Sequence, residues 1–182
     1  AIFSVFAVLV VALLCAGVTA GVHHGLAGAF AASDLALDEA KGGAQRKLLF
    51  PDATSFESQS APAVEGLNSV YKADTGAWVF DVTSAQGYHG DVELMVGINA
   101  DGTVAGIQVV AEDETDGIGT NAFTEEYFGG FAGAPAAGEL TVDEAGAGQT
   151  HVDAVSGATF TSRAVVDCLN IAFVAYAQMG GN

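Results

Sequence analysis

The stretch DVELMVGINADGTVAGIQVV, residues 91–110, decides the fold that the sequence predicts. In its first half apolar residues alternate with others, so Val92, Leu94 and Val96 fall on one face of an extended strand. The tetrapeptide NADG, residues 99–102, has the composition of a tight turn, and a second stretch rich in Val and Ile follows it. The pattern therefore predicts an antiparallel β-hairpin.

The segments on either side of this hairpin predict a mixed α+β domain. The expected elements are a strand over 77–82, an acidic loop over 111–120, a short aromatic helix near 125–131, a Gly- and Ala-rich surface excursion over 129–148, a short strand within 151–155 and a final helix. Apolar residues recur at helical spacing from Val165 to Tyr176, and we expect Thr161 or Ser162 to cap that helix. Residues 51–68 are polar and are expected to be irregular. The fold class is therefore α+β, with a mostly antiparallel sheet flanked by helices.

The N-terminal segment AIFSVFAVLVVALLCAGVTA, residues 1–20, is almost wholly apolar, and the first charged residue is Asp34. A helix of about 20 such residues can cross a bilayer. Two other interpretations compete with this one. Val18-Thr19-Ala20 resembles a signal-peptide cleavage site, and Cys15 could be a lipoprotein cysteine, although Leu14 is larger than the residue usual before it. We expect a membrane anchor on the length rule.

The chain is accordingly expected to have three parts: a transmembrane helix over 1–22, a juxtamembrane connector over 23–50 and a single domain over 51–182. Lys and Arg are scarce after the apolar span, which the positive-inside rule permits on the outer side of a membrane. We therefore expect a single-pass protein of a bacterial or archaeal cell membrane, with membrane lipid as one partner. Its C-terminal domain would lie on the extracytoplasmic side.

The charge and cysteine content exclude several classes of function. The 182 residues include 5 Lys and Arg against 22 Asp and Glu, a net charge of −17, which repels phosphate backbones and argues against nucleic-acid binding. Cys15 and Cys168 form no disulfide framework, and no Cys/His spacing predicts a metal site. No G-x-G-x-x-G follows a strand and no iron–sulfur cysteine set is present. The chain alone therefore has no predicted site for NAD or for an iron–sulfur cluster.

The stretch SGATFTS, residues 156–162, places four hydroxyl groups and a Gly-Ala step at the start of the final helix. A helix N-terminus has unpaired N–H groups and a partial positive charge of about half a unit, so it favours a phosphate. Gly157 lets the backbone approach such a group, Ala158 keeps the floor small and Thr159 offers a hydroxyl. Arg163, one turn into the helix, could neutralise a dianion. An ordinary loop and N-cap without a ligand fits the same residues.

Residues 153–159, DAVSGAT, resemble the flavinylation motif of the FMN-binding domain family, D-x-x-[ST]-G-A-T. In that family the last threonine carries FMN through a phosphoester bond, so the resemblance implies covalent FMN on Thr159. It also implies a dedicated extracytoplasmic flavin transferase that installs the group from FAD with magnesium. Asp153 could orient the loop or take part in that metal-assisted transfer. The cofactor-binding residues expected in this stretch are Asp153, Ser156, Gly157, Ala158, Thr159, Thr161 and Arg163.

Residues 110–119, VAEDETDGIG, resemble the E-T-P-G-L-G loop of the same family. The matching positions are Glu114, Thr115, Gly117 and Gly119, and Ile118 is a mild change; of these, Glu114, Thr115, Gly117 and Ile118 join the expected site. Asp116 stands where proline is usual and Glu112 where histidine is usual. Negative charge near a flavin disfavours its reduced anion, so our hypothesis is that these departures lower its potential.

The same acidic loop has two other interpretations. Its first residues mimic a calcium-binding EF-hand loop, but Phe123 stands where the closing Glu is required, so that pattern fails. A merely solvated acidic loop remains an alternative. Trp78, Tyr88 and Phe160 could stack on an isoalloxazine ring, although aromatic residues at strand positions more often belong to a core. Phe160 is the strongest of the three because it adjoins the threonine.

The resemblance extends to residues 49–53 and 87–90 and so covers most of the chain. A single membrane helix followed by one small domain resembles the G subunit of Rnf complexes. This implies an electron-transfer subunit of an ion-translocating ferredoxin:NAD oxidoreductase, a redox carrier that is no complete enzyme alone, with the other subunits as partners. The alternatives are the C subunit of the sodium-translocating NADH:quinone reductase, a stand-alone membrane-anchored extracellular flavoprotein, and a non-redox adhesion or scaffold domain.

Overall fold

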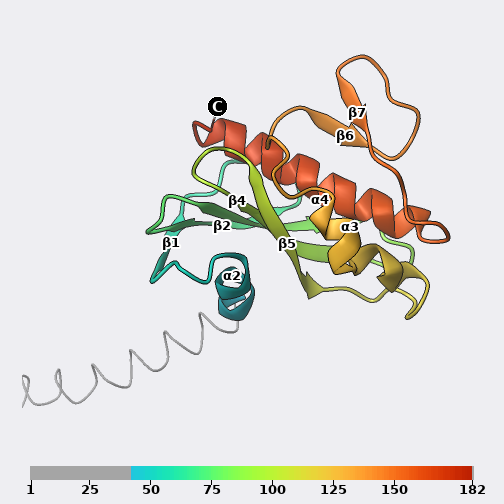
Figure 1. Ribbon diagram of the computed structural model, residues 1–182, viewed down its shortest axis with the longest axis horizontal. Coiled ribbons are helices and arrows are strands. Elements are labelled where there is room, and N and C mark those ends of the chain that lie inside the picture. The colour runs from blue at the N-terminus through green and yellow to red at the C-terminus, as the bar shows by residue number, and fades with distance from the viewer. Residues whose placement is uncertain (1–41, 182) are drawn as a thin grey trace, which may run out of the picture. The chain divides into compact units, whose positions relative to one another are not determined.

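The computed structural model describes residues 42–181, so the expected membrane span over 1–22 lies outside the described residues. In chain order the elements are α2 (Gly43–Leu49), β1 (Phe56–Gln59), β2 (Leu67–Ala73), β3 (Trp78–Ser84), β4 (Val92–Ile98), β5 (Val104–Ala111), the 3₁₀ helix η1 (Gly119–Phe123), α3 (Glu125–Gly129), β6 (Glu139–Thr141), β7 (Gln149–His151) and α4 (Thr159–Gln178). Figure 1 shows α2 and α4 on opposite sides of the main sheet.

The main sheet is an antiparallel meander with the strand order β1-β2-β3-β4-β5. The predicted hairpin is confirmed: β4 pairs with β5, with Val96 opposite Ile107. Its turn is closed by a hydrogen bond of 2.8 Å from the Asn99 N–H to the Thr103 carbonyl, and Gly102 takes a φ of +83°, which favours glycine. A second, two-stranded parallel sheet joins β6 to β7. The α+β class with a mostly antiparallel sheet is therefore confirmed.

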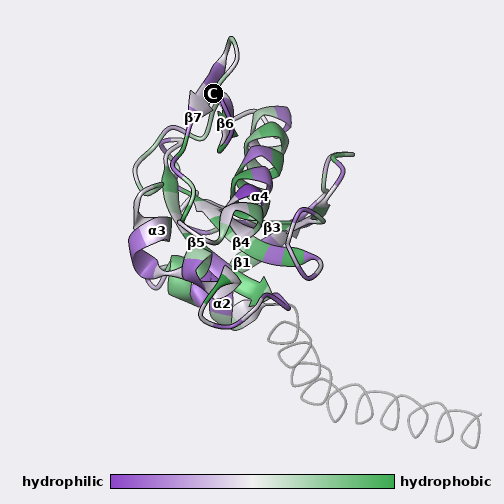
Figure 2. Cartoon of the chain, turned by 90° about the vertical axis from the view of Figure 1, so that its right-hand side faces the viewer, coloured by the Kyte–Doolittle hydropathy of each residue, from purple (hydrophilic) through white to green (hydrophobic). Residues whose placement is uncertain are grey.

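α4 covers one face of the main sheet. The predicted inward side chains Val92, Leu94 and Val96 are fully buried, in one cluster with Leu169 and other residues of α4. Figure 2 shows the hydrophobic residues of β4 and β5 between α4 and α2. Cys168 also belongs to this cluster, and burial raises the pKa of its thiol well above the ordinary range. We therefore regard it as a packing residue.

The opposite face of the sheet is also buried. Tyr71, Val79 and Met95 form a second cluster there. Leu49, the last residue of α2, and Phe50, which follows it, pack against this cluster. The buried Arg46 of α2 places its guanidinium carbon 3.9 Å from the centre of the Tyr71 ring, a cation–π geometry. Because both faces are covered, β4 is buried at almost every position and does not alternate strictly.

Several boundaries differ from the sequence-based expectation. Residues 51–68 contain β1, an edge strand of sequence FESQ that has no apolar alternation, and β2 was not predicted. The short strand β7 lies at 149–151, ahead of most of the predicted 151–155 stretch. The excursion over 129–148 contains β6, whose Leu140 is tied to Asn170 of α4 by hydrogen bonds of 2.8 and 2.9 Å.

Within residues 42–181, one helix is long and apolar enough to cross a bilayer by length and composition alone, namely α4. Most of its apolar stretch is buried inside the domain, so it serves here as the core helix.

Candidate functional site

α4 begins at Thr159, and no side chain caps it. Its N-cap residue is Ala158, with φ −120° and ψ 34° and no side-chain hydrogen bond to the helix. The prediction that Thr161 or Ser162 caps the helix is therefore wrong, because both lie within its first turn. Gly157 takes a φ of +82°, a left-handed conformation that explains the glycine at this position. The first N–H groups of α4 thus have no side-chain partner and remain available to an acceptor.

The four hydroxyl groups of residues 156–162 have different environments. Thr161 is buried and donates to the Glu114 carboxylate over 2.7 Å, while the buried Ser162 accepts the Val155 N–H over 3.0 Å. Ser156 and Thr159 are exposed, and within residues 42–181 neither side chain makes a hydrogen bond. Only these two hydroxyls are open to a reaction with an outside group.

Thr159 borders a pocket of about 410 Å³, a volume within the range of ligand sites. Its walls come from the loop after β3, the acidic loop after β5 and the start of α4. Seven of the expected site residues line it: Glu114, Thr115, Ile118, Gly157, Ala158, Thr159 and Thr161. The structure thus brings together two sequence motifs that lie about 40 residues apart.

Glu114 joins the three walls of this pocket. One carboxylate oxygen accepts the backbone N–H groups of Tyr88 at 2.7 Å and His89 at 3.2 Å, and the other accepts the Thr161 hydroxyl at 2.7 Å. The residue is only 9% exposed, and hydrogen-bond donors satisfy the charge of a buried carboxylate. Both carboxylate oxygens therefore accept hydrogen bonds from this chain, which indicates that Glu114 positions the segments around the pocket.

Two glycines leave the space that Glu114 needs. A Cβ on Gly119 would lie 2.5 Å from Oε2 of Glu114, and a Cβ on Gly87 would lie 2.7 Å from its Oε1 and 2.3 Å from the Gly90 carbonyl. The loop similarity had identified Gly119 as a match. For Gly87 the available signal was the glycine-flanked sequence GYHG, residues 87–90, whose steric reason appears only in the structure.

The acidic loop folds as a tight turn around Thr115. The Thr115 carbonyl accepts the N–H groups of Ile118 at 3.1 Å and Gly119 at 2.9 Å, and Gly117 takes a φ of +71°. The Thr115 hydroxyl lies 3.2 Å from Nε2 of His89, a residue that the sequence did not single out. No group of three or more His, Cys, Asp or Glu side chains suited to a metal ion occurs in the described part of the chain.

The rim of the pocket is apolar and exposed. Tyr88, Ile118 and Phe160 are 66%, 55% and 54% exposed, and the Tyr88 and Phe160 rings lie 5.8 Å apart between centres. Trp78, the third aromatic candidate, lies on β3 against Phe80, at 6.3 Å between ring centres, and does not line the pocket. Exposed apolar side chains gathered around one pocket are unusual on a solvated surface and indicate a ligand or a partner.

Four expected residues do not line the pocket, although one of them, Gly117, belongs to the loop that borders it. Arg163 lies four residues after Thr159, on the same helix face. However, its guanidinium donates two hydrogen bonds to the Asp143 carboxylate, the longer of which measures 3.1 Å. This contact lowers the pKa of Asp143. Asp153 is exposed, 3.4 Å from Nε2 of His151, and Ser156 is exposed beside the pocket. Gly117 contributes the turn of the acidic loop.

Comparison with known proteins places these features in a family. Residues 87–174 match the family model of the FMN-binding domain, so the matched region includes both pocket motifs. A solved structure, that of the C subunit of the Na(+)-translocating NADH-quinone reductase of Parabacteroides distasonis, is similar with a TM-score of 0.49 and 22% identity, covering 62% of this chain and 61% of that one.

Two curated relatives match over much of the chain. The chain is 30% identical to the G subunit of the Na(+)-translocating ferredoxin:NAD(+) oxidoreductase complex of Acetobacterium woodii, over 74% of this chain and 73% of that protein. It is 34% identical to the G subunit of the proton-translocating ferredoxin:NAD(+) oxidoreductase complex of Clostridium ljungdahlii, over 65% of this chain and 63% of that protein. The match thus spans just under two thirds of the second relative's length. The chain belongs to the family of the G subunits of ion-translocating ferredoxin:NAD(+) oxidoreductase complexes, whose domain is an FMN-binding domain.

Proposed function

We propose that Thr159 carries FMN through a phosphoester bond and that the domain relays electrons within an ion-translocating ferredoxin:NAD(+) oxidoreductase complex. One observation carries the proposal. Of the four hydroxyl groups of residues 156–162, only that of Thr159 is exposed, makes no hydrogen bond within the described residues and lines the pocket. The similarity to G subunits supports the same conclusion.

The residues around Thr159 fit a bound phosphate. The uncapped N-terminus of α4 offers N–H groups beside the hydroxyl, and the partial positive charge of the helix end favours a negative group there. Arg163 lies on the same face one turn later, so its charge adds to that field although its guanidinium contacts Asp143. A phosphoester on Thr159 would therefore lie where this acidic chain offers positive potential.

The rest of the pocket fits a flat aromatic ring. The exposed side chains of Tyr88, Ile118 and Phe160 form an apolar border at the pocket, and aromatic rings favour stacked or edge contacts of this kind. FMN, when bound, supplies the capacity to accept and return electrons. The contribution of this chain is to hold the ring at an open surface, where electron exchange with another protein requires no deep entry.

The remaining parts of the proposal concern location and partners. We propose that residues 1–22 anchor the protein in the membrane and that the domain lies outside the cytoplasm, since the span is apolar and few basic residues follow it. In that compartment an extracytoplasmic flavin transferase would attach the cofactor. The other subunits of the complex would supply the sites for ferredoxin and NAD.

Detection of covalent flavin tests the attachment. The chain is produced together with a flavin transferase, and wild type, Thr159→Ala and a control Ser60→Ala are compared by fluorescence in a denaturing gel and by intact mass. We expect a fluorescent band and one added FMN in wild type and control, and complete loss of both in Thr159→Ala. A bare, unmodified mass for the wild type, or fluorescence that persists in Thr159→Ala, would contradict the proposal.

Co-purification tests the assignment to a complex. A tagged chain expressed in its own host is solubilised in mild detergent and purified at low salt. A stable set of membrane subunits with ferredoxin:NAD(+) oxidoreductase activity would support the proposal. A fluorescent chain that purifies alone would instead favour a stand-alone flavoprotein.

A further inference from the structure

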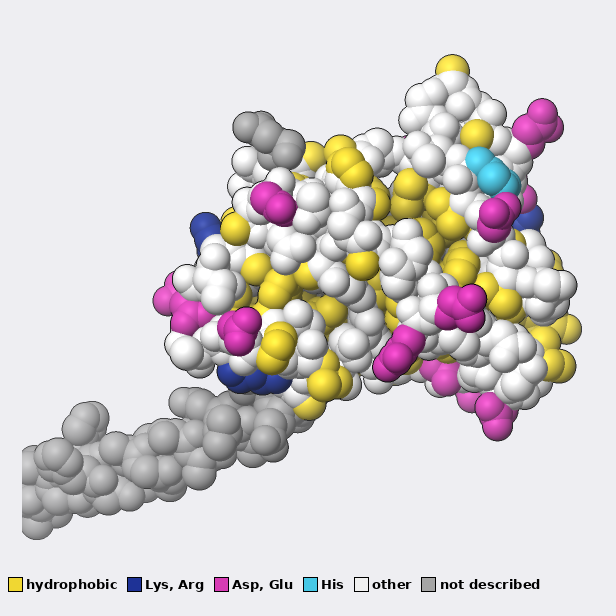
Figure 3. All heavy atoms as spheres, viewed as in Figure 1, with side chains coloured by type: hydrophobic (Ala, Val, Ile, Leu, Met, Phe, Trp, Pro, Cys, Tyr) yellow, Lys and Arg dark blue, Asp and Glu magenta, His cyan; other side chains and the backbone are white. Residues whose placement is uncertain are grey.

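A larger cleft, of about 830 Å³, opens between α3 and the β6–β7 arm, which we define as residues 139–151. It shares no lining residue with the pocket beside Thr159. Its walls combine the segments 121–135 and 140–155 with single residues of β5 and α4. Figure 3 shows hydrophobic atoms at the bottom of a hollow on this side of the molecule. The proposed flavin site therefore leaves this larger cleft unused.

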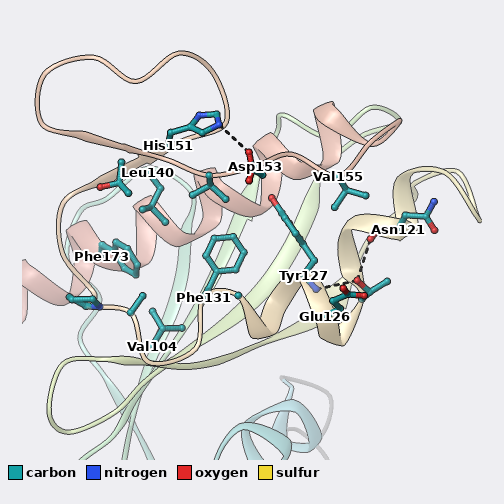
Figure 4. Close-up of a pocket in the computed structure, with 16 residues that line it drawn as sticks. Val104, Asn121, Glu126, Tyr127, Phe131, Leu140, His151, Asp153, Val155 and Phe173 are labelled. Atoms are coloured by element: carbon teal, nitrogen blue, oxygen red, sulfur yellow. Dashed lines mark hydrogen bonds and ion pairs between the residues drawn. The ribbon is translucent and has the colours of Figure 1, made fainter.

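The floor of the cleft is apolar. Val104, Phe131 and Phe173 are almost fully buried and form part of the main core. Leu140 of the β6–β7 arm and Val152, directly after the arm, pack against that core. Figure 4 shows the side chains of Val104, Phe131, Leu140 and Phe173 directed toward the cavity. These five side chains offer no hydrogen bonds, so their best complement is a large apolar side chain that excludes water.

The lips of the cleft are acidic. Glu126 of α3 stands on one lip and Asp153 on the other (Figure 4), and no Lys or Arg lines the cavity. Both carboxylates are exposed. Within the described residues Glu126 makes no ion pair, while Asp153 has only His151, at 3.4 Å. The cleft thus has negative charge at its mouth and apolar surface beneath.

This distribution of charge decides between occupants. A second copy of the chain would bring a net charge of −17 against an equal charge. Its Arg163 is held by Asp143, and its Lys72 lies 4.7 Å from the Trp78 ring centre. Residues 1–41 contain one cationic residue, Lys41. An anionic lipid surface would be repelled.

We propose that the cleft docks a basic segment of a different polypeptide, a neighbouring subunit, which inserts large apolar side chains between Lys or Arg residues that meet Glu126 and Asp153. The inference rests on the proposed function, because it takes the chain as one subunit of a complex. Apolar contacts in the cleft supply the affinity, and the charges at its lips supply the register and the rate of association.

Photo-crosslinking in the assembled complex tests the identity of the occupant. p-Benzoylphenylalanine replaces the exposed Thr150 at the cleft, or the exposed Ser58 on β1 as a control, and the crosslinked peptides are identified by mass spectrometry. We expect position 150, and not position 58, to crosslink to a segment of another subunit that contains Lys or Arg beside large apolar residues. A crosslink to a second copy, to residues 1–41, to lipid or to an acidic segment overturns the proposal, as does the absence of any crosslink.

A charge reversal tests the electrostatic part. Glu125 and Glu126 are neighbours in the first turn of α3, but only Glu126 lines the cleft, so Glu125→Lys controls for effects on the helix. We expect Glu126→Lys to weaken retention of the subunit about tenfold and to release it at lower NaCl, with Glu125→Lys resembling wild type. Equal release of the two variants overturns the proposal. Gel fluorescence of the same samples reports flavin attachment separately, so its absence in wild type would speak against the proposed function and not against this docking site.

Discussion

At the scale of single residues, Glu114 illustrates how a buried acid organises the pocket. Its carboxylate accepts two backbone N–H groups from the loop after β3 and one hydroxyl from α4. Glu114→Ala leaves these donors without partners, and we expect the free energy of unfolding to fall by about 2–4 kcal/mol. Urea denaturation measures the loss. The neighbouring exposed Asp113 is the control, and Asp113→Ala should change stability by less than about 0.5 kcal/mol; equal effects would show that Glu114 is not a structural tie.

We expect Asp116 to affect the midpoint potential of the proposed flavin. It is exposed in the loop that borders the pocket, so its charge acts on the proposed cofactor through solvent and is partly screened. Asp116→Asn removes a negative charge and should raise the midpoint potential by about 5–20 mV at low ionic strength. Redox titration of the flavinylated domain checks this, with Asp52→Asn as a distant control. A shift that does not shrink at high salt would show that the effect is not electrostatic.

At the scale of elements, the junction between the acidic loop and α4 tolerates no added methyl group. Gly119→Ala would place a Cβ 2.5 Å from the Glu114 carboxylate and 3.0 Å from the Thr161 hydroxyl. We expect a loss of about 1–3 kcal/mol in unfolding free energy from the forced shift. Gly129 in α3 has open space around its Cβ position, so Gly129→Ala should be neutral or stabilising by up to about 1 kcal/mol. Thermal unfolding of the two variants and of wild type measures these changes in stability. If Gly119→Ala were as stable as wild type, the loop would have to shift without cost.

A second link between elements joins the β6–β7 arm to α4. Hydrogen bonds from Arg163 hold the pKa of Asp143 below its ordinary value of 3.8. A lowered folded-state pKa contributes stability that is present above the ordinary value and is lost as the pH falls through the folded one. The stability difference between wild type and Asp143→Asn should therefore be constant near neutral pH and vanish under acid conditions. Unfolding curves across pH measure it, with Glu144→Gln as the control; a difference that persists in acid would assign the effect to something other than this ion pair.

At the scale of the whole molecule, the sequence predicts what depends on local periodicity. The β4–β5 hairpin and α4 have clear periods of two and of 3.6 residues, and both are confirmed. β1 was missed because its stability comes from pairing with β2 and not from its own polar sequence. Two motifs indicated the composition of the pocket. Neither could reveal that Arg163 is held by Asp143 or that Gly87 leaves room for Glu114, because such contacts join segments distant in the chain.

The position of α4 at the end of the fold has a consequence for biosynthesis. All five strands of the meander exist once Ala111 has been made, yet the helix that shields Val92, Leu94 and Val96 comes roughly 70 residues later. Because synthesis proceeds at about 5–20 residues per second, the nascent chain exposes this apolar surface for roughly 3 to 14 seconds. A premature stop codon ahead of residue 159 would make that interval permanent. Such a product should aggregate or be degraded, even though its entire main sheet has been translated.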